Sequence, residues 1–356
     1  MSTVKVAFYT IALNEEQFVA SWYESCKEGD YLLIADTGSS DNTVARAKEL
    51  GINVINVNVA PWRFDIARNA SLAALPKDID YCVALDMDEV ICAGWRAGLE
   101  AAKERGATRP RYKYTWSWTD ANTPGLQYGG DKIHARTGYR WKHPVHEVLV
   151  PYGAVQEQHE WCDFEIHHHA DNTKSRSGYM PLLEIAVQED PHCDRNAFYY
   201  ARELYYYGRY EDAVRQFLRH LLLPTATWGA ERSASYRFIA KCKPEEAEYW
   251  ILQAIKESPT SREPYVDLAK HYYSKLNWRK MLDAAEKALA ITQRPLEYLT
   301  EADSWDHTPY DLAAISAYNL KEYTKAKEYG TAAVAITPTD SRLLSNLSFY
   351  TSSLFS

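Results

Sequence analysis

Two aspartates one residue apart, Asp86 and Asp88, follow an apolar segment at residues 81–85. Two carboxylates this close cannot both stay ionised in a cleft at low cost, and a divalent cation relieves their repulsion. Oxygen ligands suit Mg²⁺ or Mn²⁺, and such a cation can stabilise a diphosphate as a leaving group. The pattern therefore predicts a metal-dependent group-transfer site; the alternative is a turn with two solvated acids.

Two other polar clusters follow earlier apolar segments. Asn14 and Glu15 come after the apolar run at 4–13, and Asp36 begins the cluster DTGSSD after the run at 31–35. Helical spacing follows each cluster, so strands and helices alternate over the first 90 residues or so. This alternation predicts a mainly parallel sheet with helices on both faces. Ligands bind outside the carboxyl ends of such strands, where the three clusters are expected to meet.

The pattern changes between about residues 111 and 169. Aromatic, β-rich stretches such as RYKYTWSWTD and DFEIHHH are separated by Gly and Pro turns, which predicts a smaller mixed sheet completing the same domain. Alternation would place Tyr112, Tyr114, Trp116 and Trp118 on one side of a strand. Such a stripe more often belongs to a core than to a surface that stacks on an acceptor sugar or base.

From about residue 177 onward the chain has helical patterning with an internal repeat. YGRYEDA, CKPEEA and LNWRKM end at Ala213, Ala247 and Met281, which are 34 residues apart, and LKEYTKA ends at Ala326, 45 residues later. A 34-residue period is typical of tetratricopeptide repeats, in which helix pairs bury their apolar faces by stacking on one another. We expect a loop around 297–308 to account for the longer last interval. A generic helical bundle is the alternative.

Bulk composition limits the class of protein. The 356 residues are 46% hydrophobic and 25% charged, which suits about two globular domains. The net charge of −8 argues against non-specific coating of nucleic acid, although residues 103–142 are locally basic. The six cysteines form no CxxC pair, so we expect reduced thiols. No signal-peptide pattern and no membrane-spanning apolar stretch are present, so a cytoplasmic location is expected.

The ordered motifs TIALNEE, ADTGSSDNT, FDIARNASL and ALDMDE resemble those of family 2 glycosyltransferases of the GT-A fold. They are closest to the cytoplasmic subgroup with tetratricopeptide repeats behind the catalytic domain. The resemblance implies an α/β fold class, with a GT-A type (Rossmann-like) mixed, mainly parallel sheet domain at residues 1–176. An all-α tetratricopeptide-like domain would follow at residues 177–356.

The resemblance also implies a donor site. Glu15 would reach the ribose hydroxyls, and Asp36 would bind the edge of the base, most often uracil. Arg68 would lie near the nucleotide, with Asp65 orienting it from three residues back on the helix. Asp41 has a structural alternative, because it can cap a helix that starts at residue 43. The residues expected to contact the nucleotide sugar are Leu13, Asn14, Glu15, Asp36, Asp65, Arg68, Asp86 and Met87.

A downstream motif, WKHPVHE, supplies candidates for the general base. Similar proteins carry a His-Glu pair here, facing donor sugar and acceptor. A base is needed because an acceptor hydroxyl loses its proton as it attacks the anomeric carbon. Glu147 is the preferred candidate and His146 the other, and the sequence does not decide between them. A solvent-exposed strand is the structural alternative.

Three consecutive histidines end the β-rich region. The family often has a histidine here that completes the metal site or contacts the diphosphate. On a strand, His167 and His169 share one face, and these two are the expected metal ligands beside Asp86 and Asp88. Lys174 and Arg176 follow in a segment that could close over the phosphates.

Together these features predict an inverting glycosyltransferase that uses Mn²⁺ or Mg²⁺ and a nucleotide diphosphate sugar, most often a UDP-sugar. The acceptor hydroxyl is left open between a peptide or protein and a saccharide, and peptide or oligomer contacts through the repeats are expected. Two alternatives remain: transfer to a hydroxymethylated DNA base, suggested by the basic aromatic segment, and a non-enzymatic repeat scaffold with an inactive domain. A nucleotidyltransferase is disfavoured, because the first strand leads into the acidic motif TIALNEE rather than a Gly-rich phosphate loop.

Overall fold

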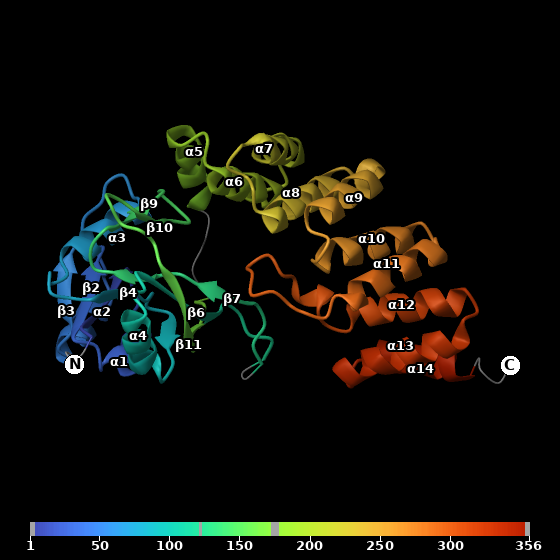
Figure 1. The fold of residues 1–356 in the computed structure, drawn as a ribbon, viewed down its shortest axis with the longest axis horizontal. Helices are drawn as coiled ribbons and strands as arrows, with labels where there is room; N and C mark the ends of the chain where they lie inside the picture. The colour runs from blue at the N-terminus through green and yellow to red at the C-terminus, as the bar shows by residue number, and fades with distance from the viewer. Residues whose placement is uncertain (1–3, 121–122, 172–177, 353–356) are drawn as a thin grey trace. The chain divides into compact units, whose positions relative to one another are not determined.

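The computed structural model describes residues 4–120, 123–171 and 178–352. The chain divides into two compact units, Met1–Ala186 and Val187–Ser356, which we call the N-terminal unit and the repeat unit (Figure 1). The first is built on mixed α/β sheets, and the regular elements of the second are all helices. This confirms the predicted fold class. The boundary expected between residues 176 and 177 lies outside the described residues.

The central sheet of the N-terminal unit has the strand order β3-β2-β1-β4-β8. Its first four strands are parallel and β8 is antiparallel to β4. The strands of this sheet are β1 (Val6–Ala12), β2 (Tyr31–Asp36), β3 (Asn53–Asn56), β4 (Tyr81–Ala84) and β8 (Ile133–Ala135). The helices of the unit are α1 (Val19–Cys26), α2 (Thr43–Glu49), α3 (Phe64–Ala73), α4 (Trp95–Glu104) and α5 (Tyr179–Glu189), the last of which continues past Ala186.

The central sheet is buried on both faces, because successive side chains of β1 point to opposite sides. On one face Phe8 belongs to a core that includes Trp22 of α1 and Trp95 of α4. On the other face Tyr9 belongs to a core that includes Leu72 of α3 and Trp141. Helices therefore cover both faces, as the alternation of strands and helices predicted.

A second, four-stranded sheet has the order β5-β11-β6-β7, and a separate hairpin pairs β9 with β10. β11 runs parallel to β6 and antiparallel to β5, and its register places His168 beside Glu89. The end of β11 therefore reaches the segment that follows β4. These strands are β5 (Glu89–Ile91), β6 (Arg109–Thr115), β7 (Gln127–Gly130), β9 (Tyr139–Lys142), β10 (Val148–Pro151) and β11 (His159–His168).

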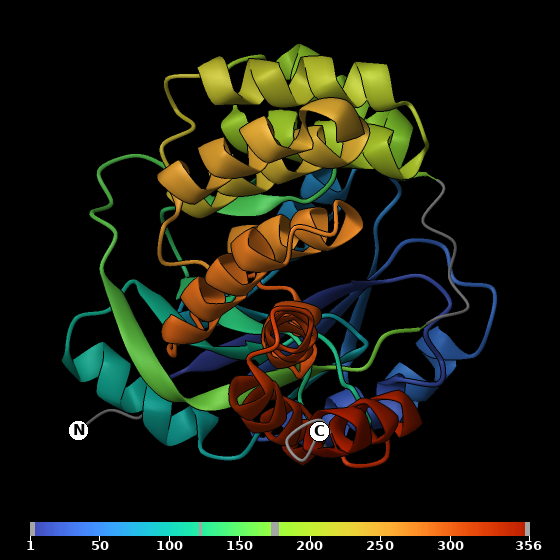
Figure 2. The ribbon, with the colours of Figure 1, turned by 90° about the vertical axis from the view of Figure 1, so that its right-hand side faces the viewer.

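The repeat unit consists of helix pairs that stack in chain order, as Figure 2 shows from yellow through orange to red. The predicted turns YGRYEDA, CKPEEA, LNWRKM and LKEYTKA lie between the two helices of successive pairs. The pairs are α6 (Asp194–Tyr206) with α7 (Tyr210–Leu222), α8 (Gly229–Cys242) with α9 (Ala247–Glu257), α10 (Glu263–Ser274) with α11 (Trp278–Ala290), and α12 (Thr308–Asn319) with α13 (Tyr323–Ile336), followed by α14 (Ser341–Ser352). The short helices η1 (Pro244–Glu246) and η2 (Ala302–Ser304) lie in connections.

The residues that define the period occupy equivalent buried positions. Ala213, Ala247, Met281 and Ala326 are all buried at the start of the second helix of their pairs. The longer last interval, from Met281 to Ala326, contains the connection at residues 291–307, as expected. All six cysteines are free, and no helix among the described residues is long and apolar enough to cross a membrane.

Gly208 ends α6 with a φ of 73°, a backbone conformation that L side chains rarely adopt, and a Cβ there would meet nothing within 4 Å. Gly208→Ala should therefore lower the free energy of unfolding by about 1–2 kcal/mol through backbone strain alone. Urea unfolding followed by circular dichroism measures the change. Gly178→Ala is the matched control, because that position also has open space and its φ is not positive. Equal free energies of unfolding for the two variants would contradict backbone strain at position 208.

Candidate functional site

The segments after β1, β2 and β4 leave the central sheet at one edge. Ala12 pairs with Asp36 across β1 and β2, and Tyr9 pairs with Ala84 across β1 and β4. The three polar clusters that follow these strands therefore gather at this edge. The indole of Trp22 donates a hydrogen bond of 2.9 Å to the carbonyl of Leu85, which fixes the chain just before Asp86.

Hydrogen bonds lock the first two clusters together. Asn14, whose φ is 55°, accepts the amide of Ser40 at 2.8 Å through Oδ1, and its own amide donates to Ser39 Oγ at 2.9 Å. The amide of Glu15 donates to Thr43 Oγ1 at 2.8 Å. Asn14 and Glu15 thus connect the end of β1 to the loop after β2.

Asp36 is buried, and its carboxylate accepts the amides of Gly38 and Ser39 at 3.1–3.2 Å. These bonds fix the position of its carboxyl group at the strand end. Asp41 accepts both the amide and the hydroxyl of Thr43, the first residue of α2, which is the structural role expected for it.

Leu13, directly after β1, is 49% exposed, so an apolar side chain is accessible to solvent beside these polar groups.

Arg68 on α3 joins two of the expected site residues. Its Nη2 lies 2.8 Å from Asp86 Oδ1, and its Nε donates to Glu147 Oε1. The guanidinium is 8% exposed and stacks over the Trp141 ring, with 4.9 Å from Cζ to the ring centroid. Its third nitrogen, Nη1, is buried and has no hydrogen-bond partner among the described residues.

The partner of Asp65 differs from the one expected. Asp65 forms a two-point ion pair with Arg63, with nitrogen–oxygen distances of 3.0 and 3.1 Å, rather than orienting Arg68. Because Arg68 is already engaged by Asp86 and Glu147, Asp65 pairs with the arginine before α3 instead. Asp65 thus lies at the start of α3 without a contact to the charged groups around Asp86.

Lys132, which the sequence did not single out as a site residue, completes a buried network. Its Nζ lies 2.8 Å from Asp86 Oδ2 and 2.5 Å from Glu89 Oε1. Glu89 is 1% exposed and also accepts the Tyr114 hydroxyl at 2.5 Å. Burial opposes the ionisation of Asp86, but Arg68 and Lys132 outweigh it and hold the pKa of Asp86 well below its ordinary value. Each carboxylate oxygen of Asp86 is therefore paired with a cationic side chain.

Met87 is buried in the hydrophobic core on the α1 side of the central sheet. Its side chain is therefore closed to solvent, and only its backbone could contact a nucleotide sugar. The apolar residue between the two aspartates anchors the turn that separates them.

The structure brings His168, rather than His167 or His169, to Asp88. His168 Nε2 lies 3.2 Å from Asp88 Oδ2, and its ring stacks on Trp116 at 4.3 Å. Its Nδ1 donates to the Trp116 carbonyl at 2.9 Å, so neutral His168 keeps its lone pair on Nε2, the atom that faces Asp88. Burial lowers the pKa of His168, but the hydrogen bonds to Asp88 and Trp116 raise it above the ordinary value.

The side chains of the other two histidines point elsewhere, because alternation along β11 turns His167 to the opposite face and only the backbone amide of His169 contacts Asp88, at its carbonyl. His167 Nε2 lies 3.2 Å from Glu165 and 3.5 Å from Cys92 Sγ. His169 is exposed and stacks on Trp118. The register between β11 and β5 thus places the side chain of His168 at Asp88, whereas the metal ligands were predicted on the face of His167 and His169.

Glu147 is held by the connection between α3 and β9. Asn69 of α3 accepts the amide of Trp141 at 2.9 Å and donates to its carbonyl at 2.8 Å. Glu147, whose side chain is 10% exposed, thus stays beside Arg68. His146 has a φ of 50°, and its ring packs edge-on against Tyr179 at 5.6 Å.

The charges of this cluster fit a divalent cation. The cluster holds four carboxyl groups and two cationic side chains, and neutral His168 is the state in which this residue can bind a metal. Asp88 Oδ2 and His168 Nε2 are the oxygen and nitrogen atoms available as ligands. The acids of the cluster are Asp86, Asp88, Glu89 and Glu147, and the cations are Arg68 and Lys132.

The aromatic and basic features of residues 103–142 have structural roles. Tyr112 and Tyr114 are buried in the core, and β6 ends at Thr115 before Trp116. Most basic side chains of this stretch bind nearby acids or carbonyls within the unit. These side chains are those of Lys103, Arg105, Arg109, Arg111, Lys132 and Arg136. These basic side chains are thus engaged by partners within the N-terminal unit.

Lys174 and Arg176 lie outside the described residues.

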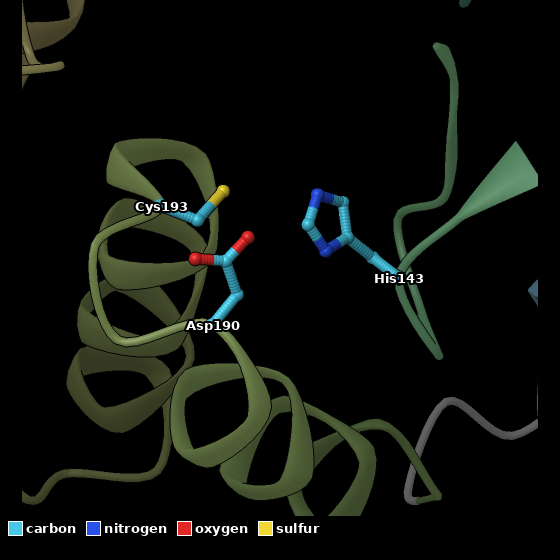
Figure 3. Close-up of side chains that lie close together, drawn as sticks. All are labelled: His143, Asp190 and Cys193. Atoms are coloured by element: carbon cyan, nitrogen blue, oxygen red, sulfur yellow. The ribbon is translucent and has the colours of Figure 1, made fainter. Parts of the chain in front are cut away.

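Figure 3 labels His143 of the N-terminal unit, whose φ is 84°, and Asp190 and Cys193 of the repeat unit. Within the repeat unit, the amide of Cys193 donates to the Asp190 carbonyl at 3.2 Å in the turn before α6. Because His143 belongs to the other unit, we assign no joint metal site to these three residues.

No protein family profile matches this chain, and no curated protein matches it by sequence. Among solved structures, MamA is 16% identical, with a TM-score of 0.37, over 47% of this chain and 91% of that chain. A thermophilic TPR protein of Thermus thermophilus is 17% identical, with a TM-score of 0.32, over 50% of this chain and 89% of that one. Glucosyl-3-phosphoglycerate synthase from Mycobacterium tuberculosis, in complex with Mn²⁺, UDP and glucosyl-3-phosphoglycerate, is 26% identical, with a TM-score of 0.27, over 31% of this chain and 44% of that one.

Arg68→Met should lower the free energy of unfolding at pH 7 by about 3 kcal/mol, because it leaves Glu147 without its cation and Asp86 with Lys132 alone. The lowered pKa of Asp86 means that the ion pair stabilises the fold fully above the ordinary carboxyl pKa. The difference from wild type should therefore persist above about pH 4 and shrink as the pH falls further. Urea unfolding at a series of pH values tests this, with exposed Arg140→Met as the control. A loss no larger than that of Arg140→Met would show that Arg68 does not hold the cluster.

Proposed function

We propose that the N-terminal unit is a metal-dependent glycosyltransferase domain that moves a sugar from a nucleotide diphosphate donor to an acceptor hydroxyl. The observation that carries the proposal is the pairing of Asp88 with His168 at the end of β4, beside an Asp86 that Arg68 and Lys132 already neutralise. One acid is left to bind a cation and the other is fixed as a positioning group. The ordered motifs of the sequence support the same reaction class.

The nucleotide binds at the ends of β1 and β2. Asp36, held by two backbone amides, accepts a ring N–H of the base, which fits the N3–H of uracil. The exposed side chain of Leu13 covers an apolar face of the base or ribose. Glu15 follows directly and contributes to the ribose side of the pocket. A UDP-sugar is therefore the proposed donor.

The diphosphate lies between Arg68 and Asp88. The buried Nη1 of Arg68 has a donor to offer a phosphate oxygen. Asp88 Oδ2 and His168 Nε2 hold Mn²⁺ or Mg²⁺ when it is bound. The cation supplies charge neutralisation for the leaving diphosphate. Lys132 keeps Asp86 in the orientation that fixes Arg68.

The transfer needs a base on the acceptor side. Glu147 Oε1 is bound by Arg68, and Oε2 accepts no hydrogen bond from any described residue. Oε2 takes the proton of the acceptor hydroxyl as its oxygen bonds to the anomeric carbon and the bond from that carbon to the diphosphate breaks. One direct displacement of this kind inverts the anomeric centre. His146, packed on Tyr179, is the less favoured base.

The acceptor is a hydroxyl of a peptide, protein or saccharide. The hydroxymethylated DNA base is not favoured, because the basic side chains that suggested it are engaged inside the N-terminal unit.

Wild-type protein should be stabilised more by UDP with Mn²⁺ than by either alone, as measured by thermal unfolding or calorimetry. Asp88→Asn and His168→Asn should each weaken the Mn²⁺-dependent binding of UDP at least tenfold, because each removes one proposed ligand. His169→Asn is the matched control, at the residue directly after β11, and should bind like wild type. Normal binding by His168→Asn together with loss in His169→Asn would refute the assignment of His168.

Glu147→Gln should keep the affinity for UDP and Mn²⁺ and lose transfer by a factor of about 10²–10⁴, the range expected for a general base. His146→Asn should retain most of the transfer. Donor hydrolysis and transfer to a panel of peptides and oligosaccharides provide the measurement. Unchanged turnover in Glu147→Gln would exclude it as the base, and loss only in His146→Asn would assign the role to His146.

A further inference from the structure

Residues 291–307 of the repeat unit, here called the connecting segment, join α11 to α12 (Figure 1). The segment contacts α6, α8 and α10, although it follows all of them in sequence. It thus occupies a face that three successive helix pairs share. This observation is independent of the activity of the N-terminal unit.

Tyr298 is the first anchor of the connecting segment. Its ring stacks on Tyr199 of α6 at 6.1 Å, with an interplanar angle of 14°, and packs against Trp228 at 5.5 Å. Its hydroxyl donates to Glu231 Oε2 of α8 at 2.6 Å. Glu231 is buried and is also bound by His220 at 3.2 Å. The helices thus form an aromatic site with a polar end, which recognises a tyrosine.

Glu301, three residues after Tyr298, is the second anchor. Its carboxylate accepts Arg237 Nη2 of α8 at 2.7 Å, and its amide donates to Glu263 Oε1 of α10 at 3.1 Å. The Trp305 indole donates to the same Glu263 oxygen at 2.8 Å. Contacts of this kind, one aromatic, one acid and one backbone amide, are those by which a groove binds an extended peptide.

The segment leaves part of this face unsatisfied. Ser233 of α8 lines the contact with Pro295 and Leu299, and its buried hydroxyl has no hydrogen-bond partner among the described residues. A groove of about 260 Å³ continues from Arg237 between α8, α9 and α10. Lys241 and Lys270 line the groove and already pair with Glu301 and Asp303 of the connecting segment, so the groove favours an acidic occupant.

We propose that the connecting segment is a displaceable internal ligand of this groove. An acidic, extended peptide with a tyrosine followed three residues later by an acid takes its place. Such a peptide reproduces the contacts of Tyr298 and Glu301 and supplies the acids that pair with Lys241 and Lys270. While the segment is seated, the groove is closed to other peptides.

Hydrogen exchange on the full wild-type chain tests whether the segment detaches. Amides of residues 294–301 should exchange at least tenfold faster than those of α8 and α10, because the segment opens without unfolding the helices. Tyr298→Phe keeps the ring and removes the hydroxyl, and should speed exchange of the segment further. Tyr249→Phe, an exposed tyrosine of α9, is the control and should change nothing. Exchange of the segment at the rate of α8 and α10 would overturn the proposal, since the segment would then be an integral part of the fold.

A labelled peptide of residues 294–305 tests binding in trans. It should bind the Tyr298→Ala/Glu301→Ala variant at least tenfold more tightly than wild type, by fluorescence anisotropy. A peptide with both anchors replaced by alanine should bind neither protein. Absence of binding by the folded variant, checked by circular dichroism, would overturn the proposal. If the double variant does not fold, Tyr298→Phe replaces it: at least threefold tighter peptide binding than wild type supports the proposal, and equal binding overturns it.

Discussion

The guanidinium of Arg68 lies buried between two carboxylates that come from distant parts of the chain. Asp86 follows the fourth strand of the central sheet, and Glu147 precedes the hairpin strand β10. Arg68 pairs with both carboxylates and, together with Lys132, holds the pKa of Asp86 well below its ordinary value. Arg68 therefore fixes the distance between the edge where a donor would bind and the segment that would face an acceptor. Asn69, the next residue on α3, adds two hydrogen bonds to the same connection.

Because Arg68 is paired in this way, the two aspartates of the motif have different roles. Asp86 is neutralised from both sides, by Arg68 and by Lys132, and so acts as a positioning group. Asp88, two residues later, turns toward His168 instead. The buried side chain of Met87 between them keeps the two carboxylates in separate surroundings. The two acids of the motif therefore differ in their surroundings: Asp86 belongs to an ion-pair network, and Asp88 faces a histidine.

Much of the fold was predictable from the sequence, because period-two burial and the 34-residue repeat depend on local spacing. The gathering of Asn14, Asp36 and Asp86 followed from the rule for parallel strands. Which of the three histidines faces Asp88 could not be predicted in this way. It depends on the register between β11 and β5, which local sequence patterns do not determine. Lys132 was missed for the same reason, since only folding brings it to Asp86.

A crystal structure with UDP and Mn²⁺ bound tests the proposed donor site most directly. Anomalous scattering locates the manganese independently of the nucleotide. It should lie within bonding distance of Asp88 Oδ2 and His168 Nε2, with Arg68 still paired to Asp86 and in contact with the diphosphate. Manganese held by His167 or His169, or a nucleotide bound away from the ends of β1, β2 and β4, would contradict the proposed site.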